Sequence, residues 1–198
     1  MKRVFLVAII FVASSLFASC VLEQKGVVNV DFKAYKTPLK IGVGGKFNTV
    51  LYNNAVKTAD DLKALLVGST VEIDASSVNS ANASRDVKLD KFFFGLMSTK
   101  TIRAKILDVT TKVYGANGKP LSGIIKVHIE MNGVAHDAEL RYRYKGEILQ
   151  ADGYIDLGDF HALRALNSLN KACYDLHQGK TWSDVAIGFK MKIIANCK

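Results

Sequence analysis

The sequence predicts a mainly β protein: an eight-stranded antiparallel barrel with short helices and one longer helix near residues 159–178. Most of the chain after residue 20 alternates apolar and polar residues with period two, which is typical of strands with one wet face. Short turn signals separate these stretches, and helical spacing appears in only three places. An antiparallel sheet of about eight strands tends to close on itself, and its interior can hold one small ligand.

The N-terminal residues have the pattern of a signal peptide, over residues 1–19. Lys2 and Arg3 precede an apolar run over 4–17, and the small residues Ala18 and Ser19 follow it. The run is shorter than the roughly 20 residues that a membrane-spanning helix needs. Residues 20–198 are then one periplasmic domain. The junction also resembles a lipobox, in which Cys20 would carry a lipid, and both processing routes remain open.

The charge of the chain is strongly basic, with 27 Lys and Arg against 18 Asp and Glu. Without Lys2 and Arg3 the mature domain keeps 25 basic residues and a net charge of +7. Export argues against nucleic acid as the partner, although this charge would suggest it in a cytosolic protein. An anionic membrane surface is the partner that such a charge favours in the cell envelope.

The strands are clearest in the second half of the chain. Residues 124–131 alternate strictly, and Asn132-Gly133 then predicts a tight hairpin. Residues 137–145 form the return strand, and residues 149–157 follow after Lys145-Gly146, so that three strands form a meander. Similar alternation predicts the other strands, over residues 27–35, 40–47, 70–75, 102–114 and 185–195.

Three segments have helical spacing instead. Thr58 is the expected N-cap of the first, which carries Leu62, Leu65 and Leu66, and Ser84 is that of a second, over residues 85–89. The third, over residues 159–178, has apolar residues at steps of three and four. We expect this amphipathic helix to cover one mouth of the barrel as a lid.

The three cysteines divide into a pair and an outlier. Cys173 and Cys197 are predicted to form a disulfide, which closes a loop of about 25 residues and would stabilise the fold by roughly 3 kcal/mol. Two unrelated buried thiols are the alternative. Cys20 is left over, which favours the lipobox interpretation.

No catalytic or metal-binding pattern is present in the sequence. The histidines, at 128, 136, 161 and 177, never have the i, i+4 spacing of a helical metal site. Neither a nucleophile elbow nor a phosphate-binding loop occurs. The sequence therefore predicts no enzyme, no metal and no cofactor.

Apolar residues are more abundant on the inward faces than a simple sheet requires. Phe92, Phe93 and Phe94 form a run that is incompatible with strand alternation, so part of it must fill or line an interior. Barrels of this size are either solid or hollow. Composition alone leaves both alternatives open.

Three segments resemble the YceI-like family of exported lipid-binding proteins. Residues 70–97 contain an Arg85-Asp86 pair, then Leu89 and Phe93-Phe94, and the hairpin over 129–135 and the late stretch over 155–160 also match family motifs. The order of the motifs is shared over nearly the whole mature chain. The resemblance implies a lipocalin-like barrel that binds a polyisoprenoid, such as an isoprenoid quinone tail, in an apolar cavity without catalysis.

The resemblance and the inward alternation together predict the cavity wall. Tyr142 and Tyr144 could offer hydroxyl groups to a polar head, but the family's His-Ser pair in the first strand is replaced by Asn29-Val30, so head-group recognition is not predicted. A monomer and a homodimer both fit. The alternative function is a solid-cored envelope protein that acts through its surface, in adhesion or assembly. The predicted wall residues are Phe32, Phe47, Phe93, Phe94, Met97, Val127, Ile129, Leu140, Tyr142, Ile187, Phe189 and Met191.

Overall fold

The computed structural model describes residues 20–197, so the predicted signal peptide over 1–19 lies outside the described residues. The mainly β class is confirmed. The strands are β1 (Cys20–Lys36), β2 (Ile41–Phe47), β3 (Val50–Asn53), β4 (Thr58–Ala59), β5 (Thr70–Asp74), β6 (Val78–Asn79), β7 (Thr101–Tyr114), β8 (Pro120–Met131), β9 (Val134–Lys145), β10 (Ile148–Asp156) and β11 (Asp184–Cys197). The helices are α1 (Leu62–Leu66), α2 (Ala83–Phe92), α3 (Leu163–Ala172) and α4 (Tyr174–His177), with short 3₁₀ turns that include η2 (Phe94–Leu96).

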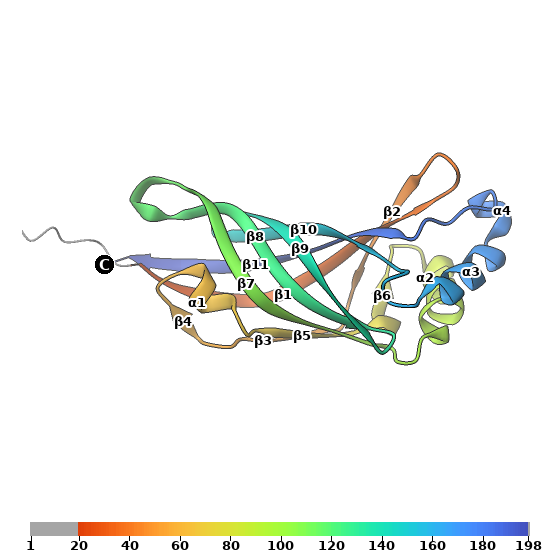
Figure 1. Ribbon diagram of the computed structural model, residues 1–198, viewed down its shortest axis with the longest axis horizontal. Coiled ribbons are helices and arrows are strands. Elements are labelled where there is room, and N and C mark those ends of the chain that lie inside the picture. The colour runs from red at the N-terminus through yellow and green to blue at the C-terminus, as the bar shows by residue number, and fades with distance from the viewer. Residues whose placement is uncertain (1–19, 198) are drawn as a thin grey trace, which may run out of the picture.

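All strands belong to one curled antiparallel sheet (Figure 1). Its order is β3-β5-β7-β8-β9-β10-β11-β1-β2-β6, and β4 pairs with β1 off this path. The sheet has eleven strands where eight were expected. The three additional strands, β3, β4 and β6, have only four, two and two residues, too few for alternation to be visible in the sequence.

The expectation that the sheet closes on itself is wrong: its described strands do not form a continuous ring of hydrogen-bonded pairs. In the described part of the chain, β3 has no ladder with β1, and only the short β4 bridges to β1 at Leu22 and Glu23. A bulge in β1 accompanies this seam: the register with β11 shifts between Lys25 and Asn29, and Gly26 has a φ of 72°. Such a bulge bends a strand and interrupts its pairing.

The β8–β9 hairpin forms as the sequence predicts. Asn132 and Gly133 have φ angles of 56° and 75°, as a type I′ turn requires. The side-chain amide of Asn132 also donates to the Phe160 carbonyl at 3.0 Å, and its oxygen accepts from the Ser98 amide at 2.8 Å. The turn therefore ties the sheet to the segment that follows η2 and to the segment that precedes α3.

The two ends of the barrel are closed differently (Figure 1). At one end Leu62, Leu65 and Leu66 of α1 are buried in the core, and Tyr142 and Tyr144 are almost fully buried near the β7–β8 turn. At the other end α2 packs against α3. The first end is a packed plug and the second is a helical lid, which confirms the lid expected of the long amphipathic segment. None of the described helices is long and apolar enough to cross a bilayer.

The helix boundaries differ from the sequence prediction. Asp61 caps α1 by accepting from the Ala64 amide at 2.8 Å, whereas Thr58 lies in β4. Asn82, rather than Ser84, caps α2. The expected helix over 159–178 is instead α3 and α4, separated at Cys173, whose φ and ψ are −124° and 24°. The apolar stripe continues through this break, so sequence periodicity does not reveal it.

The predicted disulfide between Cys173 and Cys197 is wrong. Cys173 is a free, buried thiol at the end of α3, whereas Cys20 is disulfide-bonded. The register of β1 with β11 places Cys20 directly opposite Cys197. The reason for the error is that β1 begins at Cys20 rather than near residue 27, so the start of the domain reaches the end of the last strand.

This arrangement predicts the result of thiol mapping on the mature protein. After unfolding without a reductant, alkylation should modify Cys173 alone, and after reduction it should modify all three cysteines. Replacement of Cys20 with Ser should lower the free energy of unfolding by about 2–4 kcal/mol, because the unfolded chain loses a long-range cross-link. A disulfide-linked peptide that contains Cys173, read by mass spectrometry, is the contrary result.

Candidate functional site

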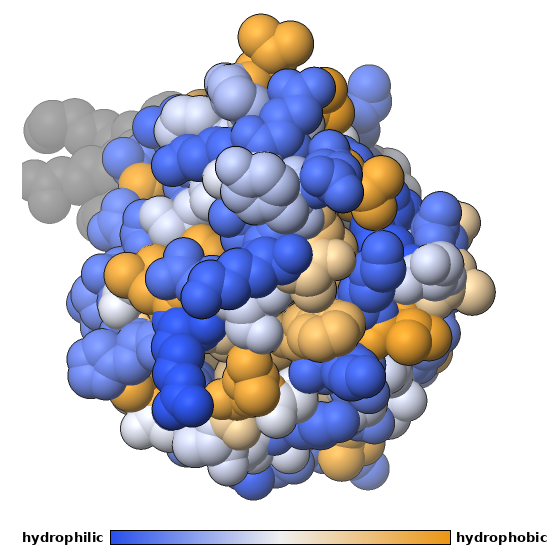
Figure 2. All heavy atoms as spheres, turned by 90° about the vertical axis from the view of Figure 1, so that its right-hand side faces the viewer, coloured by the Kyte–Doolittle hydropathy of each residue, from blue (hydrophilic) through white to orange (hydrophobic). Residues whose placement is uncertain are grey.

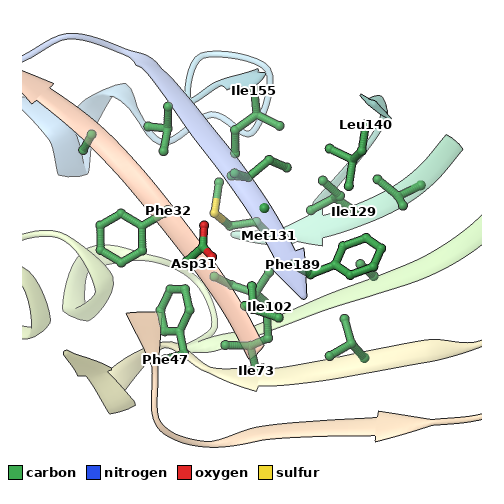
Figure 3. Close-up of a pocket in the computed structure, with 18 of the residues that line it drawn as sticks. Asp31, Phe32, Phe47, Ile73, Ile102, Ile129, Met131, Leu140, Ile155 and Phe189 are labelled. Carbon is green, nitrogen blue, oxygen red and sulfur yellow. The ribbon is translucent and has the colours of Figure 1, made fainter. Parts of the chain in front are cut away.

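An apolar cavity lies between the curled sheet and the helical lid. It has a volume of about 200 Å³, and strands β1, β5, β7, β8 and β11 contribute to its wall. Leu89 of α2 and Leu166 and Leu169 of α3 close it from the lid side. Figure 3 shows Ile129, Leu140 and Phe189 projecting toward the same space as Phe32 and Phe47. The cavity is therefore a continuation of the apolar core that side chains do not fill.

The size of the cavity is appropriate for part of a long chain. A dry apolar cavity of about 150 Å³ holds one benzene molecule, so this cavity of about 200 Å³ admits on the order of eight carbon groups. The lining is almost entirely apolar, and an empty cavity of this type does not attract ordered water.

Four phenylalanines form one side of the cavity near the lid. Phe32 of β1 lies 5.5 Å from Phe47 of β2, which lies 6.0 Å from Phe94, and Phe93 lies 5.0 Å from Phe94 between ring centroids. Gly45 is opposite Phe32 in the register, and a Cβ there would lie 2.5 Å from the Phe32 ring. The glycine therefore provides the space for the Phe32 ring.

The structure brings most of the predicted wall residues together. Met97 and Tyr142 do not line the cavity: Met97 follows η2 and packs in the core, and Tyr142 belongs to the plug. Alternation identifies which residues of a strand point inward. It does not show where along the barrel axis the packed plug ends and the cavity begins. The other ten line the cavity: Phe32, Phe47, Phe93, Phe94, Val127, Ile129, Leu140, Ile187, Phe189 and Met191.

The hydroxyl groups of Tyr142 and Tyr144 already have protein partners. The Tyr142 hydroxyl shares a hydrogen bond of 2.6 Å with Thr111 Oγ1, and the Tyr144 hydroxyl donates to the Ile193 carbonyl at 2.8 Å. Burial is the main reason that the pKa of each phenol is raised. These two tyrosines hold the plug together, so the expectation that they offer hydroxyls to a ligand head has no support.

Sequence reasoning missed several wall residues, of which Tyr52 is the most polar. It lies on β3 and lines the cavity beside Ser69, and its buried hydroxyl has no hydrogen-bond partner among the described residues. Burial raises the pKa of Tyr52 more than the nearby Ser69 hydroxyl lowers it. The stretch Val50–Asn53 alternates in the expected way, but four residues are too few to identify a strand.

Comparison with known proteins identifies the family. A family model described as the YceI-like domain matches residues 24–196. The chain belongs to the YceI-like family. No curated protein matches it.

Solved structures have the same fold as this YceI-like chain at low sequence identity. A polyisoprenoid binding domain from Saccharophagus degradans has a TM-score of 0.58 at 13% identity, and covers 90% of this chain and 99% of its own. BcnA of Burkholderia cenocepacia has a TM-score of 0.57 at 12% identity, with coverages of 84% and 96%. The YceI protein of Campylobacter jejuni has a TM-score of 0.53 at 17% identity, with coverages of 79% and 85%. The likeness confirms the predicted fold.

The rim of the cavity in this YceI-like chain combines an indole with cations. Trp182, which precedes β11, lines the cavity and donates from Nε1 to the Thr37 carbonyl at 2.8 Å. The ammonium groups of Lys180 and Lys40 lie 4.6 Å and 5.0 Å from the centroid of its ring. Cations over an aromatic face are attracted to its negative quadrupole. The two lysines therefore hold the indole in place at the edge of the lid.

One carboxylate borders the cavity wall. This is Asp31, and Asp152 lies near it. Both side chains approach Gly188 of β11, because a Cβ added to this glycine would lie 3.0 Å from Asp31 Oδ1 and 3.1 Å from Asp152 Oδ1. Burial and the neighbouring Asp152 raise the pKa of Asp31, and the Lys190 ammonium partly opposes them. In the part of the chain that the structure describes, no group of three His, Cys, Asp or Glu side chains is placed to hold a metal ion.

Proposed function

We propose that this protein is an exported, non-enzymatic carrier that binds a long apolar lipid, a polyisoprenoid or an isoprenoid quinone, in the cavity beneath its helical lid. The observation that supports this proposal most directly is the apolar cavity of about 200 Å³ that the side chains leave unfilled. Membership of the YceI-like family supports the proposal, as does the fold shared with a domain described as polyisoprenoid-binding.

The physical basis of such binding is the burial of methylene groups. Each buried methylene contributes about 0.8 kcal/mol, so ten of them contribute roughly 8 kcal/mol before the costs of association are subtracted. Those costs are several kcal/mol. The enclosed length of the chain therefore decides affinity, and the apolar wall requires no charged partner for the tail.

The proposed location is the periplasm. The pattern over residues 1–19 supports export, and a disulfide at Cys20 supports an oxidising compartment, where such bonds persist. A thiol in a disulfide cannot also carry a thioether-linked lipid. The proposal therefore favours a free periplasmic protein over a lipoprotein anchored through Cys20.

The alternative was a solid-cored envelope protein that acts through its surface. That function requires side chains that meet across the middle of the barrel. The packed plug near Tyr142 meets this condition at one end only, since the lid half encloses the cavity. Carriage of an apolar ligand is therefore the better supported of the two.

Filling the cavity tests the proposed carrier function. Ala104 on β7 lines the cavity, and its replacement with Phe should place a ring in the free space. We expect the affinity for a C15 polyprenol to fall about tenfold or more, since a tenfold loss corresponds to fewer than two displaced methylenes. The thermal stability should stay the same or rise, because the substitution fills a void.

The matched control is Ala135→Phe, at an exposed position on β9. It adds the same ring without entering the cavity, so its affinity for the polyprenol should equal that of the wild type. Equal binding by all three proteins, measured by displacement of a fluorescent apolar dye, is the result that excludes this cavity as the binding site.

The lid end has the chemistry of a surface that meets an anionic membrane. Lys88 of α2, Lys171 of α3 and Lys180 form no ion pair with another described residue, and Tyr174 and Leu176 of α4 are exposed nearby in sequence. Figure 2 faces this end and shows apolar atoms among hydrophilic ones. Each lysine near an anionic bilayer contributes about 1 kcal/mol. The proposal is that this end approaches the membrane when lipid is exchanged.

Charge reversal tests the orientation. A variant with Glu at positions 88, 171 and 180 should bind vesicles that contain phosphatidylglycerol at least tenfold more weakly than the wild type, in a cosedimentation assay at low salt. The control carries Glu at Lys57, Lys112 and Lys145, which are exposed elsewhere and produce the same change of net charge. An equal loss in both variants would show a response to net charge alone and would contradict docking by the lid end.

A further inference from the structure

The hydroxyl of Tyr52 is one of the few buried polar groups that have no hydrogen-bond partner. Among the described residues, only Tyr52 and Thr37 have a buried side-chain oxygen without a hydrogen-bond partner. Thr37 does not line the cavity, whereas Tyr52 does. A buried hydroxyl without a partner costs about 1–3 kcal/mol, so a position of this kind calls for an explanation.

The hydroxyl groups of two other tyrosines in the core, Tyr142 and Tyr144, have hydrogen-bond partners within the protein. Thr111 satisfies the Tyr142 hydroxyl and the Ile193 carbonyl satisfies that of Tyr144. Both hydroxyls lie in the packed plug. Tyr52 differs because its ring belongs to the wall of the hollow half, where no protein group completes its hydrogen bond.

The surroundings of Tyr52 leave its proton available. Tyr52 pairs with Val71 in the β3–β5 ladder, and Ser69 precedes β5 on the same side of the cavity. Ser69 Oγ accepts from the Ala55 amide at 3.1 Å, and its hydroxyl is near enough to lower the pKa of Tyr52 but makes no hydrogen bond with the Tyr52 hydroxyl. Apolar side chains from β5 and β7, including Ile73 and Ile106, form the nearby wall. The Tyr52 hydroxyl is thus a single donor in an apolar setting.

We propose that the Tyr52 hydroxyl donates a hydrogen bond to an uncharged carbonyl or hydroxyl oxygen on the polar head of the bound lipid, which lies beside Ser69 at the β3–β5 wall. This inference rests on the proposed carrier function and specifies how its ligand is oriented. The head lies inside the barrel and the tail extends toward the aromatic cluster under the lid. The site thereby selects lipids that carry one oxygen acceptor over plain hydrocarbons.

The lack of an inward-facing cation in the cavity defines the class of head. Lys105 is the only Lys or Arg among the residues that line the cavity, and its side chain is exposed. Burial of an ionised phosphate or carboxylate without a paired cation is far more costly than burial of a neutral oxygen. A quinone carbonyl or a prenol hydroxyl therefore fits the site, whereas an ionised head does not.

The test compares two probes that differ only in the head: a benzoquinone with a decyl tail and decylbenzene. Displacement of a fluorescent apolar dye from the mature protein measures both affinities. In the variant Tyr52→Phe, the affinity for the quinone should fall about five- to tenfold, the value of one ordinary hydrogen bond. The affinity for decylbenzene should not fall. Without lipid, Tyr52→Phe should resist unfolding better than the wild type, because the substitution removes a buried hydroxyl that has no hydrogen-bond partner.

Tyr142→Phe is the matched control. It also removes one phenolic oxygen, but it breaks the bond to Thr111, so it should unfold more easily and should change both affinities by the same factor. The inference is wrong if Tyr52→Phe changes the affinities for the quinone and for decylbenzene by the same factor. It is also wrong if decyl phosphate binds more tightly than the quinone and this binding depends on Tyr52. In either case the carrier function still stands. If the wild type binds neither decyl probe and no polyprenol, the carrier function itself fails, and this inference with it.

Discussion

The structure depends on a mismatch between the curvature of one sheet and the volume of its inward side chains. An antiparallel sheet of this width encloses an interior that large side chains can just fill. At the plug end they do, because Tyr142, Tyr144 and the leucines of α1 are almost fully buried in the core there. Toward the lid, aliphatic side chains and the cluster of four phenylalanines line the interior but do not span it. The cavity is what remains.

This mismatch explains why the lid is required. An open apolar hollow would expose the inward faces of several strands to water, which is unfavourable in proportion to the exposed area. Leu89, Leu166 and Leu169 cover that area from α2 and α3. The Asn132 side chain ties the β8–β9 turn to the start of this lid, so the helices stay in place over the opening.

Periodicity in the sequence predicts the mainly β fold and the meander from β8 to β10. Of the twelve wall residues proposed from alternation and the family resemblance together, ten line the cavity. Periodicity could not predict the features that depend on position along the barrel axis. Tyr142 alternates inward as Leu140 does, yet only Leu140 reaches the cavity, because Tyr142 meets Thr111 in the plug. The break at Cys173 and the position of Cys20 opposite Cys197 depend on tertiary contacts and register. Tyr52 was missed because its strand is short.

The central claim is that the hollow half of the barrel is occupied by lipid in the cell. Native mass spectrometry of the full-length protein, expressed in bacteria and purified from the periplasm without detergent, tests this most directly. The account predicts a species heavier than the mature chain by the mass of an isoprenoid-type lipid, which organic solvent releases for identification. A preparation with only the mass of the polypeptide, and with no lipid in the extract, would contradict it.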